Sequence, residues 1–230
     1  DGQIKVITGI RRAGKSTLLF NLFYNYLIDN GIYKENIITL QLDKRKDAKY
    51  RNPIVLAEFV ESQILKSTEK FYLFIDEIQF CYSVPDPDNA GFVITIYDML
   101  NELKDYKNLD VYVTGSNSKM LSKDISTEFR GRSSQIHVFP LSFAEFNMAI
   151  GGDKRDNFDR YMIYGGLPYI LHLKTEEQFK NYLRTERNCS EHTLDAYMRD
   201  IKQFCKLVFD DENFSDFLIV DREHARIFLV

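Results

Sequence analysis

Short apolar runs alternate with helical patterns along the first 140 residues of the chain. Runs of this length, rich in β-branched and aromatic residues, predict buried strands at residues 3–8, 36–42, 71–76, 110–115 and 134–139. Apolar residues at helical spacing predict helices between them, at about residues 15–29, 53–67, 92–105 and 117–126. This alternation predicts an α/β fold, in which a parallel sheet of about five strands lies between two layers of helices.

Two segments interrupt this rhythm. Residues 43–51 form a mostly basic stretch, and residues 81–91 are rich in Pro, Asp and Gly, so turn chemistry predicts a loop there. After Pro140 the strand patterns stop, and helical patterns follow at about residues 142–150, 156–164 and 169–184.

The composition is that of an ordinary globular protein. Hydrophobic residues make up 44% and charged residues 28%, so the chain can bury a core. Lys and Arg number 30 against 34 Asp and Glu, and this net charge of −4 argues against a protein that mainly coats nucleic acid. The sequence contains no apolar run long enough to cross a membrane and no signal peptide, and its three cysteines are widely spaced. We therefore expect a soluble, cytoplasmic protein with no membrane partner.

A glycine-rich segment carries the clearest chemistry. Residues 9–16, Gly-Ile-Arg-Arg-Ala-Gly-Lys-Ser, match the phosphate-binding pattern G-x-x-x-x-G-K-[ST] without a mismatch. Gly9 and Gly14 allow the backbone to turn several N–H groups toward a phosphate chain. Lys15 adds a charge for the β- and γ-phosphates, and the Ser16 hydroxyl is a ligand for Mg²⁺. The predicted cradle consists of Gly9, Arg11, Arg12, Ala13, Gly14, Lys15, Ser16 and Thr17.

An acidic pair ends the third predicted strand. The apolar residues 71–75 carry Asp76 to the carboxyl end of this strand, where parallel sheets place their ligands. Asp76 can hold Mg²⁺ through water. Glu77 faces the other way and can orient or deprotonate an attacking water. A capped strand end with no catalytic role is the alternative.

Two further segments suit the same site. The strand at residues 110–115 is expected next to the first and third strands, so Ser116 or Asn117 can position a water opposite Glu77. Ser and Asn also favour a helix N-cap, and both roles can coexist. Arg130 and Arg132 precede the last strand, where a guanidinium can neutralise charge on a transferring phosphoryl group. A surface pair beside a turn is the alternative.

Together these motifs resemble the P-loop ATPases of the AAA+ superfamily, and most closely a prokaryotic group of ATP-binding proteins. The resemblance covers about residues 3–184 and rests on Arg11-Arg12-Ala13-Gly14-Lys15-Ser16-Thr17-Leu18, Asp76-Glu77-Ile78-Gln79, Thr114-Gly115-Ser116-Asn117-Ser118, Gly131-Arg132, Pro140-Leu141-Ser142-Phe143-Ala144-Glu145-Phe146 and Tyr164-Gly165-Gly166-Leu167-Pro168.

The resemblance implies a three-layer P-loop core at residues 1–140, followed by a small helical lid at residues 141–184. Gly166 and Pro168 would lie near the adenine of ATP. Arg132 is the position most like the family's arginine finger, which acts on the nucleotide of a neighbouring subunit and so implies a homo-oligomer. The implied activity is Mg²⁺-dependent ATP hydrolysis, with Lys15, Glu77, Asn117 and Arg132 as catalytic residues and Ser16 and Asp76 as metal ligands.

The tail, residues 185–230, differs from the segment that this family would have here. Its Ser190, Thr193, Ala196, Tyr197 and Asp200 resemble the helical, DNA-clamping amino-terminal module of tyrosine recombinases. The tail has 6 basic and 10 acidic residues, which is unfavourable for a DNA clamp, so an amphipathic hairpin packed on the ATPase stays open. Since the chain starts directly on a strand without Met and joins two families near Arg184, we expect a fragment or a fusion.

Two other functions stay open beside ATP hydrolysis. One is a switch that binds ATP and hardly hydrolyses it. The other is a module associated with DNA, or with a DNA-bound protein, that uses the tail and the basic stretch at residues 43–51. A solvated loop is the simpler interpretation of that stretch.

Overall fold

The computed structural model describes residues 2–115, 129, 133–173, 178 and 181–182. These belong to two compact units, Asp1–Phe139 and Pro140–Val230, which we treat separately. The predicted helix at 117–126, half of the one at 169–184 and the tail lie outside the described residues. Within the part that is described, no helix is both long and apolar enough to cross a membrane.

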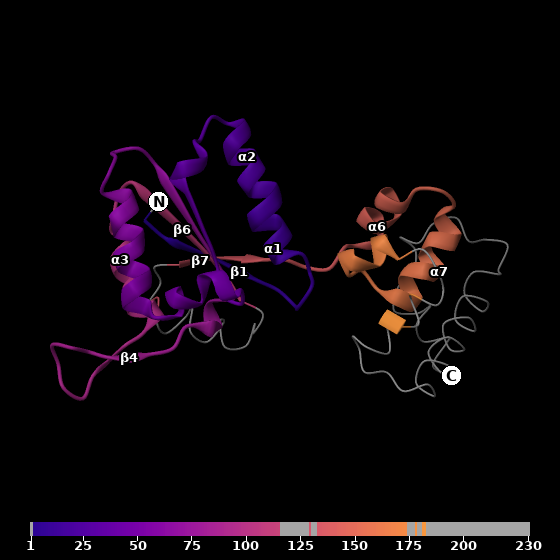
Figure 1. Ribbon diagram of the computed structural model, residues 1–230. Helices are drawn as coiled ribbons and strands as arrows, with labels where there is room; N and C mark the ends of the chain where they lie inside the picture. Colours follow the sequence, from indigo (N-terminus) through magenta and orange to yellow (C-terminus); the bar gives the residue numbers. More distant parts are fainter. Residues whose placement is uncertain (1, 116–128, 130–132, 174–177, 179–180, 183–230) are drawn as a thin grey trace. The chain divides into compact units, whose positions relative to one another are not determined.

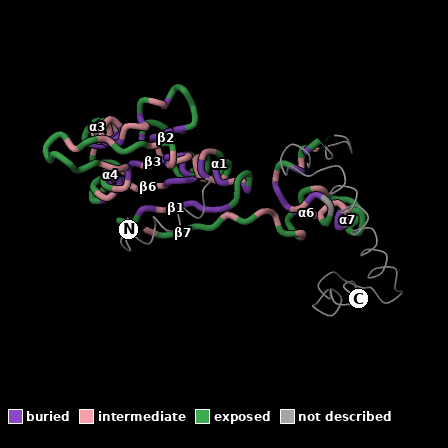
Figure 2. Tube along the Cα trace, turned by 90° about the horizontal axis from the view of Figure 1, so that it is seen from below, coloured by how far each residue is buried: buried purple, intermediate pink, exposed green. Residues whose placement is uncertain are grey.

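A five-stranded parallel sheet forms the centre of the first unit, with the strand order β2-β3-β6-β1-β7. The strands are β1 (Ile4–Thr8), β2 (Ile37–Gln41), β3 (Phe71–Asp76), β6 (Leu109–Thr114) and β7 (Ser133–His137). The α/β class and the parallel sheet are thus confirmed, as is the place of β6 beside the first and third strands. Buried residues run along β1, β3 and β6, whereas β7 is largely exposed at the edge (Figure 2).

Helices cover both faces of this sheet (Figure 1). One face packs against a continuous helical segment that consists of α1 (Lys15–Thr17), the π-helical η1 (Leu18–Phe23) and α2 (Tyr24–Asp29). The other face packs against α3 (Pro53–Ile64) and α4 (Ile96–Leu103). Successive strand residues point to opposite faces, so Phe74 of β3 packs under the first group while Leu73 and Ile75 pack under the second.

The loop predicted at residues 81–91 is confirmed except at Val84 and Pro85, where it is wrong because these two residues form one strand of a small hairpin. Its strands are β4 (Val84–Pro85) and β5 (Val93–Ile94), which pair antiparallel. The Asp86 carboxylate accepts hydrogen bonds from the Asp88 N–H and the Asn89 side chain, and this turn brings the strands together. The predicted helix start at residue 92 is also wrong, because Thr95 and Asp98 form a capping box that starts α4 at Ile96.

The basic stretch after β2 is partly a structural element. Most of this stretch forms the 3₁₀ helix η3 (Arg45–Arg51). The described part of the unit also contains the 3₁₀ helices η2 (Lys34–Asn36) and η4 (Ile78–Phe80). Within η3, buried Asp47 accepts a hydrogen bond from the Gln41 N–H at 2.9 Å, and Arg51 Nε donates to the Leu42 carbonyl at 2.7 Å. The remaining basic side chains, those of Lys44, Arg45, Lys46 and Lys49, are exposed.

The second unit is helical where it is described, with α6 (Phe143–Ile150), α7 (Lys154–Tyr164) and the 3₁₀ helix η5 (Pro168–His172). Ser142 and Asp153 cap α6 and α7 with their side chains, so α7 starts two residues before the predicted position, residue 156. A separate apolar core holds these elements together; its buried members are Phe146, Tyr164, Leu167, Ile170 and Tyr182.

Candidate functional site

The predicted phosphate cradle leaves the carboxyl end of β1 and enters α1. Gly9 has a φ of 145°, and a Cβ atom there would lie 2.2 Å from the Val138 carbonyl oxygen, so no larger residue fits. Gly14 has a φ of 101° and immediately precedes the helix. No described side chain caps α1, so the first N–H groups of the helix are available to a phosphate.

Lys15 is buried at this point, although lysine is rarely found in protein interiors. Its Nζ donates hydrogen bonds to the carbonyl oxygens of Gly9 at 2.9 Å and Ile10 at 3.0 Å, which places the ammonium group inside the loop. Burial lowers the pKa of Lys15 below its usual value, and the nearby carboxylates of Glu77 and Asp76 partly oppose this shift. The ammonium group therefore interacts electrostatically with both acidic residues.

The acidic pair is held by a threonine from the neighbouring strand. The Thr114 hydroxyl, at the end of β6, donates to Asp76 Oδ1 and accepts the Glu77 N–H at 3.3 Å. Asp76 and Thr114 are both buried. The single hydroxyl thus fixes the side chain of one acidic residue and the backbone of the next.

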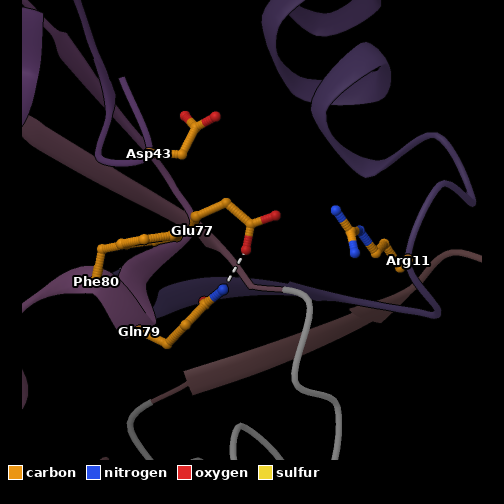
Figure 3. A pocket seen from close by; sticks show the side chains of 5 residues that line it. All are labelled: Arg11, Asp43, Glu77, Gln79 and Phe80. Atoms are coloured by element: carbon orange, nitrogen blue, oxygen red, sulfur yellow. Dashed lines mark hydrogen bonds between the residues drawn. The ribbon is translucent and has the colours of Figure 1, made fainter. Parts of the chain in front are cut away.

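Glu77 adopts a conformation that is uncommon for a residue with a side chain, with a φ of 56°. Gln79, two residues later, donates a hydrogen bond from Nε2 to Glu77 Oε2. Figure 3 shows the Glu77 carboxylate between this amide and the guanidinium of Arg11. The backbone turn and the amide together direct the carboxylate toward Arg11 of the cradle (Figure 3).

A cavity of about 380 Å³ lies in front of this carboxylate, lined by Arg11, Asp43, Glu77, Gln79 and Phe80 (Figure 3). Asp43 follows the end of β2, Glu77 follows β3, and Arg11 belongs to the cradle after β1. The cavity is therefore built at the carboxyl ends of neighbouring strands, where ligands bind in parallel sheets.

The residues present fit a magnesium ion that is bound together with phosphates. Mg²⁺ is usually held by one or two carboxylates, with phosphate oxygens and water completing its shell. Half-buried Ser16 supplies a hydroxyl and Asp76 a carboxylate at the same edge of the sheet. Among the described residues no group of three or more His, Cys, Asp or Glu side chains forms a metal cage, so the phosphates would be needed to complete this site.

Several predicted site residues lie elsewhere or outside the described part. Ser116, Asn117, Arg130 and Arg132 are not among the described residues, so their roles stay predictions. Gly166 belongs to the second unit, where a Cβ atom would lie 2.0 Å from the Leu141 carbonyl oxygen. Close packing therefore explains this glycine, and the expected contact of Gly166 and Pro168 with adenine stays a prediction.

Three residues contribute to the site beyond those predicted from the sequence: Thr114, Asp43 and Gln79. Thr114 was included in a motif but had no assigned function, and its signal was a polar residue that ends a buried strand. Asp43 belongs to the mostly basic stretch, although it lies two residues after the end of β2 at Gln41. Gln79 was part of the family pattern, and its spacing of two residues from Glu77 was the available signal.

Comparisons with known proteins agree with this site. The AAA domain family matches residues 1–147, and the phage integrase N-terminal SAM-like domain matches residues 177–230. An uncharacterized protein of Haemophilus influenzae is 34% identical over 173 residues, which cover 73% of this chain and 40% of that protein. One from Methanocaldococcus jannaschii is 35% identical over 149 residues, 63% of this chain and 28% of that protein. The chain thus spans well under half of either relative.

The tail and the overall structure give further matches. Tyrosine recombinase XerC of Pediococcus pentosaceus is 41% identical over 51 residues, 22% of this chain and 17% of that protein. Two solved structures are similar at low identity. Caenorhabditis elegans PCH-2 has a TM-score of 0.45 at 13% identity, covering 99% of this chain and 59% of that one. Thermotoga maritima RuvB has a TM-score of 0.44 at 15% identity, covering 94% of this chain and 65% of that one.

The family match extends over more than half of the chain, and it includes the cradle, the acidic pair and Thr114. It confirms the resemblance that the motifs predicted, and the tail match confirms the second one. The chain belongs to the AAA domain family of P-loop proteins, and its residues 177–230 are similar to the phage integrase N-terminal SAM-like domain.

Proposed function

We propose that this chain is a Mg²⁺-dependent ATPase that hydrolyses ATP at the carboxyl end of its parallel sheet. One observation carries the proposal: buried Lys15 lies in a glycine loop close enough to Asp76 and Glu77 for both carboxylates to affect its pKa. A cation, a metal ligand and a base are thus close together beside an uncapped helix start. Membership of the AAA domain family, which suggests ATP binding and hydrolysis, supports the proposal.

The cradle would bind the phosphate chain through backbone N–H groups, while the Lys15 ammonium offsets the charge of the β- and γ-phosphates. On binding, Lys15 Nζ would exchange its carbonyl partners, Gly9 and Ile10, for phosphate oxygens. Ser16 and Asp76 would hold Mg²⁺, which offsets phosphate charge and orients the γ-phosphoryl group.

Glu77 would act on the attacking water from the cavity side. The water oxygen bonds to the γ-phosphorus as the bond to the bridging oxygen breaks, and that electron pair stays on ADP. The water proton would pass to the Glu77 carboxylate, which the Gln79 amide holds in place, while the Thr114 hydroxyl holds the Glu77 backbone N–H. Asn117 would position the water from the opposite side, and Arg132 of a neighbouring subunit would neutralise developing charge.

Phosphate release by the wild type and two variants tests this proposal. Lys15→Ala removes the buried cation, and Glu77→Gln removes the base while keeping the shape of the side chain. Both should lose turnover by about 100-fold or more, in the range found for general bases and phosphate-binding cations. Lys70→Ala is the matched control, because Lys70 pairs with Asp110 at the other end of the sheet and should leave turnover unchanged.

Two results of this experiment would overturn hydrolysis as the function. Equal phosphate release by the wild type, Lys15→Ala and Glu77→Gln would mean that the measured turnover does not come from this site. Tight ATP binding with negligible turnover of the wild type would favour the switch that only binds nucleotide. If turnover per chain rises with protein concentration, a shared interfacial site with Arg132 is supported.

A second candidate is an ATPase whose partner is DNA. It is favoured by the SAM-like match at residues 177–230, which includes the segment similar to a tyrosine recombinase. DNA should then stimulate ATP turnover, and the stimulation should disappear as salt is raised, because phosphate contacts release counterions. Turnover that is unaffected by DNA at low salt would exclude this partner.

A further inference from the structure

Arg11 stands apart from the other charged residues around the cavity. It lies four positions before Lys15 in the cradle, yet its side chain is exposed and lines the cavity wall opposite Asp43 and Glu77 (Figure 3). The guanidinium points toward the Glu77 carboxylate. Within the described part of the chain, Arg11 has no hydrogen bond and no ion pair.

The two carboxylates opposite Arg11 already have partners within their own segments. Asp43 pairs with Lys44 at 3.1 Å, and Glu77 accepts the Gln79 amide. Arg11 therefore presents a planar group with five donors to a space that the protein itself does not fill. A guanidinium forms bidentate hydrogen bonds to phosphate oxygens, which an ammonium group cannot do.

The size and position of the cavity suit the terminal phosphate. About 380 Å³ is many times the roughly 30 Å³ that one water occupies in the liquid, so the space accommodates a phosphoryl group together with the attacking water. Glu77, the proposed base, forms one wall, and it also lies near enough to Lys15 to affect its pKa. The reacting phosphoryl group would thus lie between Lys15, Glu77 and Arg11.

We propose that Arg11 is a catalytic residue that acts within its own chain, binding γ-phosphoryl oxygens of ATP as charge develops on them. In the protein without nucleotide it faces Glu77 across the cavity, and ATP would insert its terminal phosphate between them. This inference rests on the proposed ATPase function and adds a cation in cis to the arginine expected from a neighbour.

Steady-state turnover and Mg·ATP binding, measured on the full chain, test this role. Arg11→Ala should lower kcat by about 100-fold or more, as for other arginines at transferring phosphoryl groups. The dissociation constant of Mg·ATP should stay within about threefold, because the contact strengthens only in the transition state. Arg11→Lys should recover only part of the lost kcat, since lysine cannot form bidentate hydrogen bonds to the phosphoryl oxygens.

A mixing experiment decides whether Arg11 acts in cis. Arg11→Ala chains are mixed with Lys15→Ala chains, which keep Arg11 but lack the cradle cation. Unchanged turnover of the mixture supports action within one chain, whereas restored turnover shows action in trans and overturns the proposal. Arg155→Ala, which removes an exposed guanidinium of α7, is the control and should keep wild-type turnover.

The outcomes separate this inference from the proposed function. If the wild type hydrolyses ATP and the kcat of Arg11→Ala lies within threefold of the wild-type kcat, the role of Arg11 is excluded and the ATPase function stands. No turnover and no Mg·ATP binding by the wild type would remove both. Thermal unfolding of Arg11→Ala should match the wild type, because the side chain bonds no described group.

Discussion

The two ends of the parallel sheet both carry charged residues, but they use them differently. At the amino end, the Asp110 carboxylate lies between Lys5 at 3.2 Å and Lys70 at 3.1 Å. Asn108 also bonds there, donating to the carbonyl oxygens of Ile64 and Ser67. The polar groups of this end bond one another across strands and helices, so they stabilise the fold and need no ligand.

At the carboxyl end the charges are gathered without such mutual pairing. Among the described residues, the ammonium group of buried Lys15 donates to carbonyl oxygens of its own loop, and Asp76 accepts from a hydroxyl. Burying a charge in this way costs stability unless a partner of opposite charge arrives. Buried polar groups whose charges are paired with one another, as at the amino end, have a structural role. Buried polar groups whose charges are left without a bonded partner of opposite charge, as in the described part of the carboxyl end, indicate a binding site.

The largest expected effect comes from making the same substitution at both ends. Asp76→Asn should lower phosphate release by about 100-fold or more, because the metal ligand loses its charge. Asp110→Asn should leave phosphate release unchanged and reduce the free energy of unfolding by about 1–3 kcal/mol, because hydrogen bonds to charged groups are lost. Phosphate release and urea unfolding of the two variants measure both effects. The reverse pattern, with Asp110 controlling turnover, would invalidate the comparison.

A smaller effect is expected at Thr114, where the sheet supports the site directly. Thr114→Val keeps the shape of the side chain but removes the donor to Asp76 and the acceptor for the Glu77 N–H. We expect a loss of about 1–3 kcal/mol in the free energy of unfolding, together with reduced turnover, because the buried Asp76 carboxylate and the partly buried Glu77 N–H each lose a partner. Thr114→Ser restores the hydroxyl and should regain most of both. Turnover of the valine variant equal to wild type would show that the hydroxyl does not organise the site.

The pH dependence of stability tests whether Asp110 is paired with Lys5 and Lys70 at the amino end of the sheet. Burial works against ionisation of Asp110, but its bonds to Lys70 and Lys5 prevail and hold the pKa of this carboxyl below its ordinary value. A lowered folded-state pKa means that the stabilisation is complete above about pH 4, near the unfolded pKa, and is lost as pH falls through the folded pKa. The stability difference between wild type and Asp110→Asn should therefore shrink in that acidic range. A difference that stays constant down to the folded pKa would contradict the pairing.

The smallest expected effect is the uptake of a fraction of a proton at the carboxyl end. Burial lowers the pKa of Lys15 in the free protein, and phosphate oxygens would raise it again on binding. At alkaline pH, between these two pKa values, Mg·ATP binding should take up protons, and its affinity should fall as pH rises further. Calorimetry in buffers with different ionisation enthalpies measures the uptake. Proton release in this range would contradict the assigned contact.

What could be predicted from sequence depended on how local the signal was. The cradle is contiguous, so its glycines and Lys15 could be identified directly, and β3 was predicted with its observed bounds. The capping box at Thr95 and Asp98 was also visible as a T-x-x-D pattern, yet the helix start was placed too early.

The unpredicted parts depend on segments that meet only in the fold. Thr114 bonds Asp76 across 38 residues of sequence, and this contact requires the strand order that places β6 beside β3. The cavity likewise joins Arg11, Asp43 and Glu77 from three separate segments. The strand pattern predicts β6 beside β3, but it does not predict which side chains at the strand ends bond one another, so the wall opposite Glu77 could not be derived from spacing.

Calorimetric titration with Mg·ATP tests the central claim most directly, because it asks whether the uncompensated charge at the carboxyl end is a nucleotide site. We expect a saturable heat for the wild type that ADP competes away, that is lost in Lys15→Ala and that is kept in Asp110→Asn. A wild-type titration with no heat and no competition by ADP would contradict it.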